Sequence, residues 1–221
     1  MSRVEPASPV EQMSRVEPAS PVEQMSRVEP ASPVEQMSLQ ATGERELMLT
    51  GIGGQGVQLA AQVIAQGATA DGKEVLVFGS YGGMMRGGNT DSTVVISDQP
   101  IEAPPVLSAT WSAVLMHHQY WAPLRGLISD GGLVLVNTSV FEDQLDHDRY
   151  RVVEVPATDV ATDLGNPLLA AMVMSGVYGR TSGLVSLDGL VEGMRRSVPP
   201  YRSQLIEANE AALATGWEIA A

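Results

Sequence analysis

The sequence predicts a three-layer, Rossmann-like α/β domain with a mainly parallel sheet, preceded by an irregular tail. Three features lead to this prediction. Short, nearly continuous apolar segments alternate with amphipathic ones, a glycine-rich loop follows the first apolar segment, and a polar unit is repeated at the start of the chain. Apolar strands separated by helices are typical of parallel sheets that are covered on both faces.

The expected strands are short and rich in Val, Leu and Ile. They span residues 47–50, 74–78, 92–97, 112–116, 133–137 and 151–155. The expected helices span residues 58–70, 120–128, 167–178, 187–196 and 203–214. Leu59, Val63 and Ile64 share one face of the first helix, as expected for a helix that packs on a sheet. These elements predict a single domain over residues 37–221.

The tail, residues 1–36, consists of the segment MSRVEPASPVEQ in three identical copies. Each copy contains two Pro and little apolar surface. Such a segment cannot offset the roughly 1–2 kcal/mol per residue that ordering a backbone costs. A solenoid is disfavoured because the 12-residue unit is shorter than the usual structural repeat and Pro occurs twice in each copy. We therefore expect a tail that is disordered or docked on a partner subunit.

Composition excludes several chemistries. The 221 residues include 13 Lys and Arg against 26 Asp and Glu, a net charge of −13, and no Cys. The missing Cys excludes disulfides, thiolate zinc sites, Cys-ligated iron–sulfur clusters and a Cys nucleophile. The acidic excess argues against binding nucleic acid or an anionic membrane surface. No run approaches the roughly 18 apolar residues of a membrane span, and no signal peptide is recognisable, so we expect a cytoplasmic protein.

The loop after the first strand, residues 51–56, fits the pattern G-x-G-x-x-G and opens a helix. Backbone amides and the helix dipole attract anions at such a turn, and glycines allow a phosphate to approach. A dinucleotide site would also need an acid at the end of the second strand, where the sequence is Val77-Phe78-Gly79, so NAD is disfavoured. A glycine turn needed only for packing remains an alternative. The candidate ligand-binding residues are Gly51, Gly53, Gly54, Gln55 and Gly56.

A second glycine-rich segment, residues 79–90, lies between two predicted strands. We expect it at the carboxyl end of the sheet beside the first loop, where α/β sheets bind ligands. Arg86 offers a guanidinium that can pair with a phosphate or carboxylate. A loop that contacts another subunit is the alternative. The candidate residues are Ser80, Tyr81, Met85, Arg86, Gly87, Gly88 and Asn89.

No catalytic or metal-binding residue is assigned. His117 and His118 are adjacent and lack acidic partners at a suitable spacing, so we expect a hydrogen-bonding or interface role for them. The loop that contains Asp143, Asp146 and Asp148 is expected to be a solvated acidic surface.

Both glycine segments, GIGGQGV (51–57) and SYGGMMRGGNTDSTVVISDQPI (80–101), resemble the gamma subunit of 2-oxoacid:acceptor oxidoreductases of the pyruvate:ferredoxin type. The run LGNP (164–167) followed by MVM (172–174) is similar to a segment of the same family. The helix after Ser186 and the spacing of Asn209, Ala212 and Gly216 agree. The resemblance covers about residues 46–217. Ala171 and the stretch 82–85 depart from the family pattern, which weakens any role transferred to those positions.

The resemblance implies a subunit of a complex that oxidatively decarboxylates a 2-oxoacid to an acyl-CoA. Thiamine diphosphate, magnesium and iron–sulfur clusters are then expected in partner subunits: thiamine-binding alpha and beta subunits, a ferredoxin-like delta subunit and, where NAD is the acceptor, a flavin subunit. Both glycine segments become candidates to hold coenzyme A or to close over the active site. Two alternatives stay open: a self-sufficient Rossmann-like enzyme that uses NAD or S-adenosylmethionine, and a purely structural interaction subunit.

Overall fold

The computed structural model describes residues 43–79, 87–102 and 108–221, so the repeat tail lies outside the described part of the chain. The strands are β1 (Arg45–Ile52), β2 (Glu74–Gly79), β3 (Asn89–Ser97), β4 (Thr110–Leu115), β5 (Ile128–Asn137) and β6 (Arg151–Val155). The α-helices are α3 (Val57–Ala70), α4 (Ala157–Asp163), α5 (Ala170–Ser182), α6 (Leu187–Ser197) and α7 (Ile206–Ile219). Short 3-10 helices are η1 (His118–Tyr120), η2 (Ala122–Leu124), η3 (Pro167–Leu169) and η4 (Pro200–Leu205).

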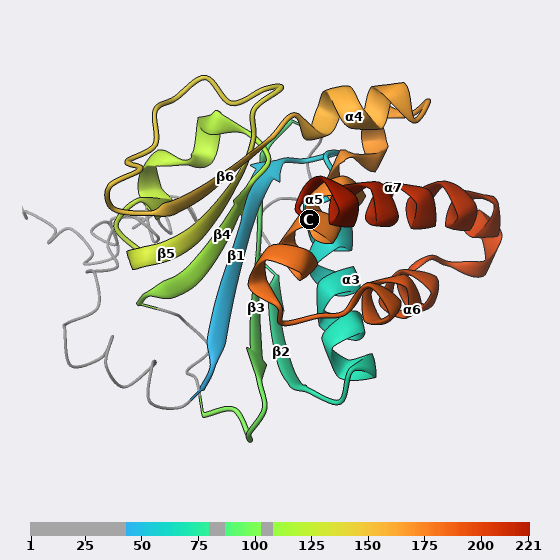
Figure 1. Cartoon of the computed structure of the whole chain (residues 1–221), viewed down its shortest axis with the longest axis horizontal. Helices are drawn as coiled ribbons and strands as arrows, with labels where there is room; N and C mark the ends of the chain where they lie inside the picture. The colour runs from blue at the N-terminus through green and yellow to red at the C-terminus, as the bar shows by residue number, and fades with distance from the viewer. Residues whose placement is uncertain (1–42, 80–86, 103–107) are drawn as a thin grey trace, which may run out of the picture.

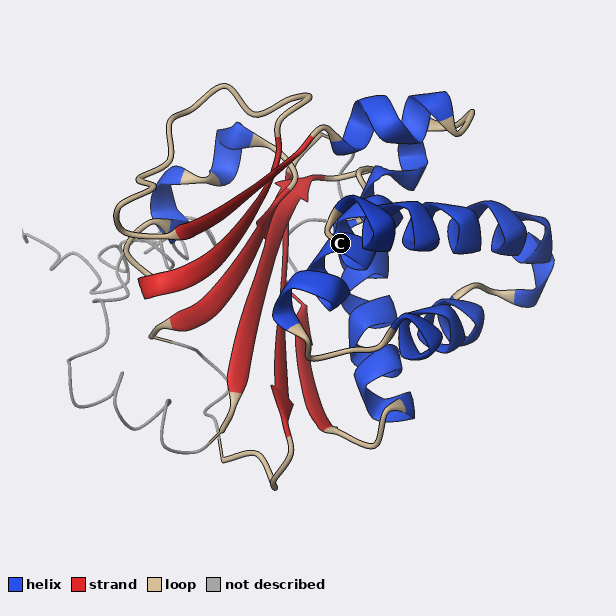
Figure 2. Cartoon of the chain, viewed as in Figure 1, coloured by secondary structure: helices blue, strands red, loops and turns tan. Residues whose placement is uncertain are grey.

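The strands form a six-stranded sheet in the order β2-β3-β1-β4-β5-β6 (Figure 2). Neighbours among β1, β4, β5 and β6 pair in parallel, whereas β3 is antiparallel to both β1 and β2. The predicted α/β fold with a mainly parallel sheet is confirmed, with β3 as the exception. The segment between β2 and β3 is shorter than the dozen or more residues that a parallel crossover requires, so β3 must run the other way.

Four helices, α3, α5, α6 and α7, cover one face of the sheet (Figure 1). Leu47 and Leu49 of β1 point into the core beneath them, while Met48 points to the core on the other face. This alternation within a strand that is buried on both sides is what a central strand of a three-layer fold requires.

The opposite face carries no long helix in the described part of the chain, and here one sequence prediction was wrong. The helix expected at residues 120–128 is replaced by the short η1 and η2, and β5 already begins at Ile128. Pro123 and Gly126 both disfavour a continuing helix. The buried Trp121 fills this layer instead, with Phe141 and Tyr150 packed against it edge-on.

Other boundaries shifted as well. The sequence did not predict α4, which follows β6 directly after Pro156. The helix expected from residue 167 begins as the 3-10 turn η3 and continues as α5 to Ser182. The last helix starts at Ile206, after η4, and extends to Ile219. Apart from the added α4, these changes divide, shift or extend a predicted helix and leave its place in the fold unchanged.

Candidate functional site

The glycine loop at the end of β1 is shaped by backbone conformations that favour glycine. Gly54 has a φ of 112°, and Gly56, the N-cap of α3, has a φ of 82°. A side chain on Gly51 would come within 2.8 Å of Met116 Cβ, and one on Gly56 within 3.0 Å of Ala171 Cβ. Glycines 51 and 56 thus allow the loop to pack against β4 and α5, while Gly54 lies exposed at the turn.

The N-terminus of α3 has no side-chain cap. Its first backbone amides have no partner within the helix, because the residues that would supply the carbonyls precede it. The helix dipole adds partial positive charge at the same point. The helix terminus expected after the glycine loop is therefore present, and its binding of an anion stays a prediction.

The side chain of Gln55 holds the loop together. Its Oε1 accepts a hydrogen bond from the amide of Ile52 at 2.8 Å, and its Nε2 donates to the carbonyl of Met116 at 3.2 Å. Both ends of the amide are engaged with backbone, so Gln55 ties the glycine loop to the end of β4. A ligand contact by this residue stays a prediction.

The structure brings the two glycine segments together. The amide of Gly53 donates to the carbonyl of Gly88 at 2.8 Å, and the amide of Gly87 donates to the carbonyl of Gly53 at 3.3 Å. This juxtaposition follows from the antiparallel pairing of β1 with β3, because the end of β1 then meets the start of β3 (Figure 1). The other candidates of the second segment, Ser80, Tyr81, Met85 and Arg86, lie outside the described residues.

A polar cluster of Thr50, Asn89 and Asp91 lies where β1 and β3 meet the glycine loops, and of these residues the sequence singled out only Asn89. Asp91 of β3 accepts hydrogen bonds from Thr50 Oγ1 on Oδ1 and from Asn89 Nδ2 on Oδ2, both at 2.6 Å. Asp91 is 6% exposed, and burial raises the pKa of its carboxyl against the opposing effect of these two hydrogen bonds. Oδ1 of Asn89 is buried and has no hydrogen-bond partner among the residues that the structure describes. One signal in the sequence could have indicated this cluster. Asn89 and Asp91 are two residues apart in a strand rich in β-branched residues, so their side chains lie on the same face.

The histidine pair at the end of β4 is held by hydrogen bonds. Nδ1 of His117 accepts from the amide of Gln119 at 3.2 Å, and Nδ1 of His118 lies 3.1 Å from the carbonyl oxygen of Val140. Partial burial and the neighbouring His118 lower the pKa of His117. The predicted hydrogen-bonding role is confirmed for both residues.

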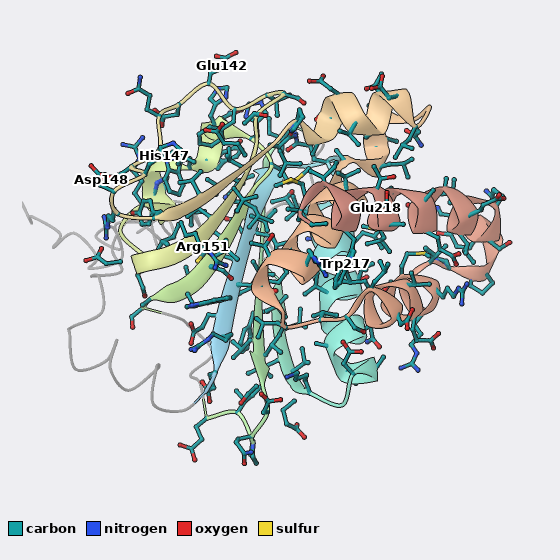
Figure 3. All side chains as sticks on the ribbon, viewed as in Figure 1. Glu142, His147, Asp148, Arg151, Trp217 and Glu218 are labelled. Atoms are coloured by element: carbon teal, nitrogen blue, oxygen red, sulfur yellow. The ribbon has the colours of Figure 1, made fainter. Side chains whose placement is uncertain are left out.

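A hollow of about 380 Å³ lies away from the glycine loops, between the end of β5 and β6. Phe141, Asp143 and His147 are among the residues that line it. Figure 3 shows Glu142, His147 and Asp148 on the outer loop that leads to β6, far from the helical layer. Glu154 Oε1 is the nearest carboxylate to His147 Nε2 at 3.7 Å, and both side chains are 62% exposed. Because His147 and Glu154 are both exposed, this hollow is open to solvent. This agrees with the solvated surface predicted for the acidic loop.

Neither a metal site nor a membrane-spanning helix occurs within residues 43–79, 87–102 and 108–221. Within these ranges no three His, Asp or Glu side chains gather as a metal site would require. None of the helices there is long and apolar enough to cross a bilayer. The chain also contains no Cys, so it supplies no thiolate to an iron–sulfur cluster.

Taken together, the fold and this site define a Rossmann-like α/β domain with an anion-attracting helix terminus. β2 ends in Phe78 and Gly79, so no acid is present there to bind a ribose. A phosphate-bearing ligand at this turn stays a prediction.

Comparison with known proteins gives the family. The sequence matches the pyruvate ferredoxin/flavodoxin oxidoreductase family over residues 46–219. It is 33% identical over 179 residues to the 2-oxoglutarate synthase subunit KorC of Methanocaldococcus jannaschii. The matched region covers 80% of this chain and 94% of that protein. The structure is similar to the gamma subunit of a keto/oxoacid ferredoxin oxidoreductase from Geobacter sulfurreducens PCA, with a TM-score of 0.69 and 27% identity over 80% of this chain and 97% of that one. A pyruvate oxidoreductase subunit, PORC, from Thermotoga maritima gives a TM-score of 0.63 and 26% identity over 80% and 96% of the two chains.

The chain therefore belongs to the pyruvate ferredoxin/flavodoxin oxidoreductase family, and it is a gamma subunit of the 2-oxoacid:ferredoxin oxidoreductase type. This confirms the resemblance drawn from the two glycine segments and the LGNP run. It also makes the chain part of an enzyme complex with other subunits.

Proposed function

We propose that this subunit holds the phosphates of coenzyme A, or closes over the site that receives them, while a 2-oxoacid is oxidatively decarboxylated to an acyl-CoA. The observation that carries the proposal is the joining of Gly53 to Gly87 and Gly88 beside the uncapped N-terminus of α3. The hydrogen bonds that join the segments use the amides of Gly53 and Gly87, and the amides of the first turn of α3 remain for an anion.

A phosphate at this position would be bound by the amides of the first turn of α3 and by the positive end of its dipole. Arg86, which precedes Gly87 in the sequence, is the charged residue nearest to the joined loops along the chain. Its guanidinium would pair with a phosphate in a bidentate manner. The missing acid at the end of β2 is consistent with a ligand whose ribose is recognised elsewhere.

The steps of the proposed reaction are divided among several subunits. The 2-oxoacid loses CO₂, two electrons pass to the acceptor, and the acyl carbon joins the sulfur of coenzyme A, whose thiol proton is released. Thiamine diphosphate supplies the carbanion chemistry when bound, and we assign it with magnesium to alpha and beta subunits. We assign the iron–sulfur clusters to a ferredoxin-like delta subunit, because this chain has no Cys. An additional flavin subunit would pass electrons to NAD.

The substrate class we propose is that of the 2-oxoacids as a whole. The relatives named above act, by their names, on 2-oxoglutarate and on pyruvate. Copurification from the native source with mass spectrometry of the companion subunits, followed by assay of these two acids, tests the assignment. A chain that turns over a substrate with NAD in the absence of partners would contradict it.

The coenzyme A role is tested in the assembled complex with Arg86→Ala. We expect the KM for coenzyme A to rise about tenfold or more while the KM for the 2-oxoacid stays unchanged. Arg202→Ala is the matched control, because Arg202 is exposed on η4 and its guanidinium stacks on Tyr201. An unchanged KM for coenzyme A in Arg86→Ala would favour a purely structural role for the glycine loops.

A further inference from the structure

Backbone hydrogen bonds alone do not explain why the two glycine segments stay joined. Gly53 bonds Gly88 and Gly87, yet glycine loses more conformational freedom on ordering than any other residue. Side chains that form hydrogen bonds between β1 and β3 next to both segments would reduce this conformational freedom. Asp91, together with Thr50 and Asn89, is placed to do so.

The register of the sheet sets this geometry. Thr50 of β1 lies opposite Asp91 of β3, and Ile52 lies opposite Asn89. Thr50 immediately precedes the first loop, and Asn89 immediately follows Gly88. Because residues two apart on a strand point to the same face, Asn89 and Asp91 share a face, and one carboxylate reaches both partners.

The carboxylate of Asp91 makes a bridge between two chain segments. One oxygen accepts from Thr50 at 2.6 Å and the other from Asn89 at 2.6 Å. Thr50 is fully buried and Asp91 is 6% exposed, so water competes little for these bonds. Hydrogen bonds to a carboxylate are stronger than those between neutral groups. The bridge therefore fixes the side-chain amide of Asn89. Through Asn89 it restricts the backbone of Gly87 and Gly88, which immediately precede this residue.

We propose that Asp91 is a positioning residue for the ligand of the glycine loops: by bridging Thr50 and Asn89 it holds Gly87 and Gly88 against Gly53 and so sets the affinity for the phosphates of coenzyme A. The inference rests on the proposed function. Asp91 does not touch the ligand in this account and acts only through the position of the second segment.

The test uses three substitutions in the assembled complex. Thr50→Val removes one hydroxyl at constant shape, Asp91→Ala removes both acceptors, and Asp91→Asn keeps an acceptor toward Asn89 and gains a donor toward Thr50. We expect the KM for coenzyme A to rise about tenfold in Asp91→Ala, and severalfold in Thr50→Val, with kcat and the KM for the 2-oxoacid within about twofold of wild type. Asp91→Asn should restore most of the affinity.

Thr110→Val is the matched control. Thr110 is also fully buried and its hydroxyl bonds the carbonyl oxygens of Glu46 and Ser112, but it lies at the start of β4, at the opposite end of the sheet. We expect it to lower the melting temperature as Thr50→Val does, without a change in the KM for coenzyme A. Should Thr50→Val and Thr110→Val change the kinetics alike, Asp91 would have only a structural role and the inference would be overturned.

The same experiments separate this inference from the proposed function. If Arg86→Ala raises the KM for coenzyme A and Thr50→Val does not, the coenzyme A site stands and the role of Asp91 is wrong. If neither variant changes that KM, the proposed coenzyme A function itself fails. Should Asp91→Ala not assemble, Thr50→Val and Asp91→Asn still give the decisive comparison, because both keep the volume of the buried site.

Discussion

The backbone amide of Gly53 donates a hydrogen bond to the carbonyl of Gly88 at 2.8 Å, although these residues belong to loops that adjoin different strands. The contact joins the turn after β1 to the segment before β3. The described parts of both glycine segments therefore lie at the same end of the strands, next to the start of α3. Substitutions in the glycine turn and in the helices and strands that pack around it test this arrangement.

The turn itself is tested by Gly54→Ala. Gly54 has a φ of 112°, which an L residue adopts only with strain of about 1–3 kcal/mol, although no atom lies within 4 Å of the added Cβ. We expect a loss of stability of that order and a higher KM for coenzyme A in the complex. Gly126→Ala, whose Cβ also meets open space and whose φ is not positive, should have neither effect. Urea unfolding of both variants and assay of the complexes give the comparison.

Close helix packing predicts that Gly216→Ala is severely destabilising. A Cβ on Gly216 of α7 would overlap the carbonyl oxygen of Val173 on α5, and a Cβ on Gly176 would overlap that of Leu213. Backbone lies on both sides, so the helices must move apart, at a cost of about 3 kcal/mol or more. Thr215→Ala, at a partly exposed position of the same helix, should change the free energy of unfolding by less than about 0.5 kcal/mol. Equal melting temperatures for Gly216→Ala and wild type would show that α5 and α7 do not pack this closely.

Asp71, from a distant part of the chain, holds Ser186, the N-cap of α6, whose hydroxyl accepts from the amide of Gly189. Its Oδ2 accepts from the amide of Ser186 at 2.6 Å and its Oδ1 from the hydroxyl of Ser186 at 2.7 Å. Asp71→Ala should therefore lower the free energy of unfolding by about 1 kcal/mol, the usual cost of losing a helix cap. Asp98→Ala, which removes only an exposed ion pair with Lys73, should cost clearly less in the same denaturation experiment.

Stability should depend on pH through Glu46. Burial raises the pKa of its carboxyl above 4.5, and hydrogen bonds from its own amide and that of Trp111 offset this only in part. Glu46 is 2% exposed, and its Oε1 has no hydrogen-bond partner within residues 43–79, 87–102 and 108–221. The folded chain thus holds the proton more tightly than the unfolded chain, so stability falls as pH rises from the ordinary pKa through the raised one.

Glu46→Gln removes this titration. The free energy of unfolding of the variant, relative to wild type, should rise by about 1 kcal/mol or more between about pH 4 and pH 7. Guanidinium unfolding at several pH values measures the difference. Two curves that stay parallel over this range would show that Glu46 does not titrate differently in the folded chain.

Much of the fold followed from local patterns. All six strands were predicted, because each contains a short run rich in apolar residues, such as residues 133–136 of β5. The polar starts of β3 and β5 were missed: β3 begins at Asn89 and β5 at Ile128. The helix expected at residues 120–128 failed, because its apolar residues serve a second core around Trp121 rather than a helix face. α4 was missed, because it spans only Ala157–Asp163 and offers little periodicity.

The candidate site was predicted only in part. Its glycines were found because the spacing of Gly51, Gly53 and Gly56 reflects a backbone requirement that is visible in sequence. Gln55 was singled out for a ligand, and the structure shows it bonded to Ile52 and Met116. Asp91 was missed, because an acid inside a strand has no local signature of a partner on another strand.

The sequence by itself determined the class of fold, the two glycine segments and the family resemblance, since these depend on periodicity and spacing along the chain. Only the tertiary structure decided that β3 runs antiparallel to β1 and brings Gly88 to Gly53, and that one buried carboxylate bridges Thr50 and Asn89. Strand register depends on the packing of faces that are distant in sequence, and a hydrogen bond exists only when register places donor and acceptor within about 3 Å.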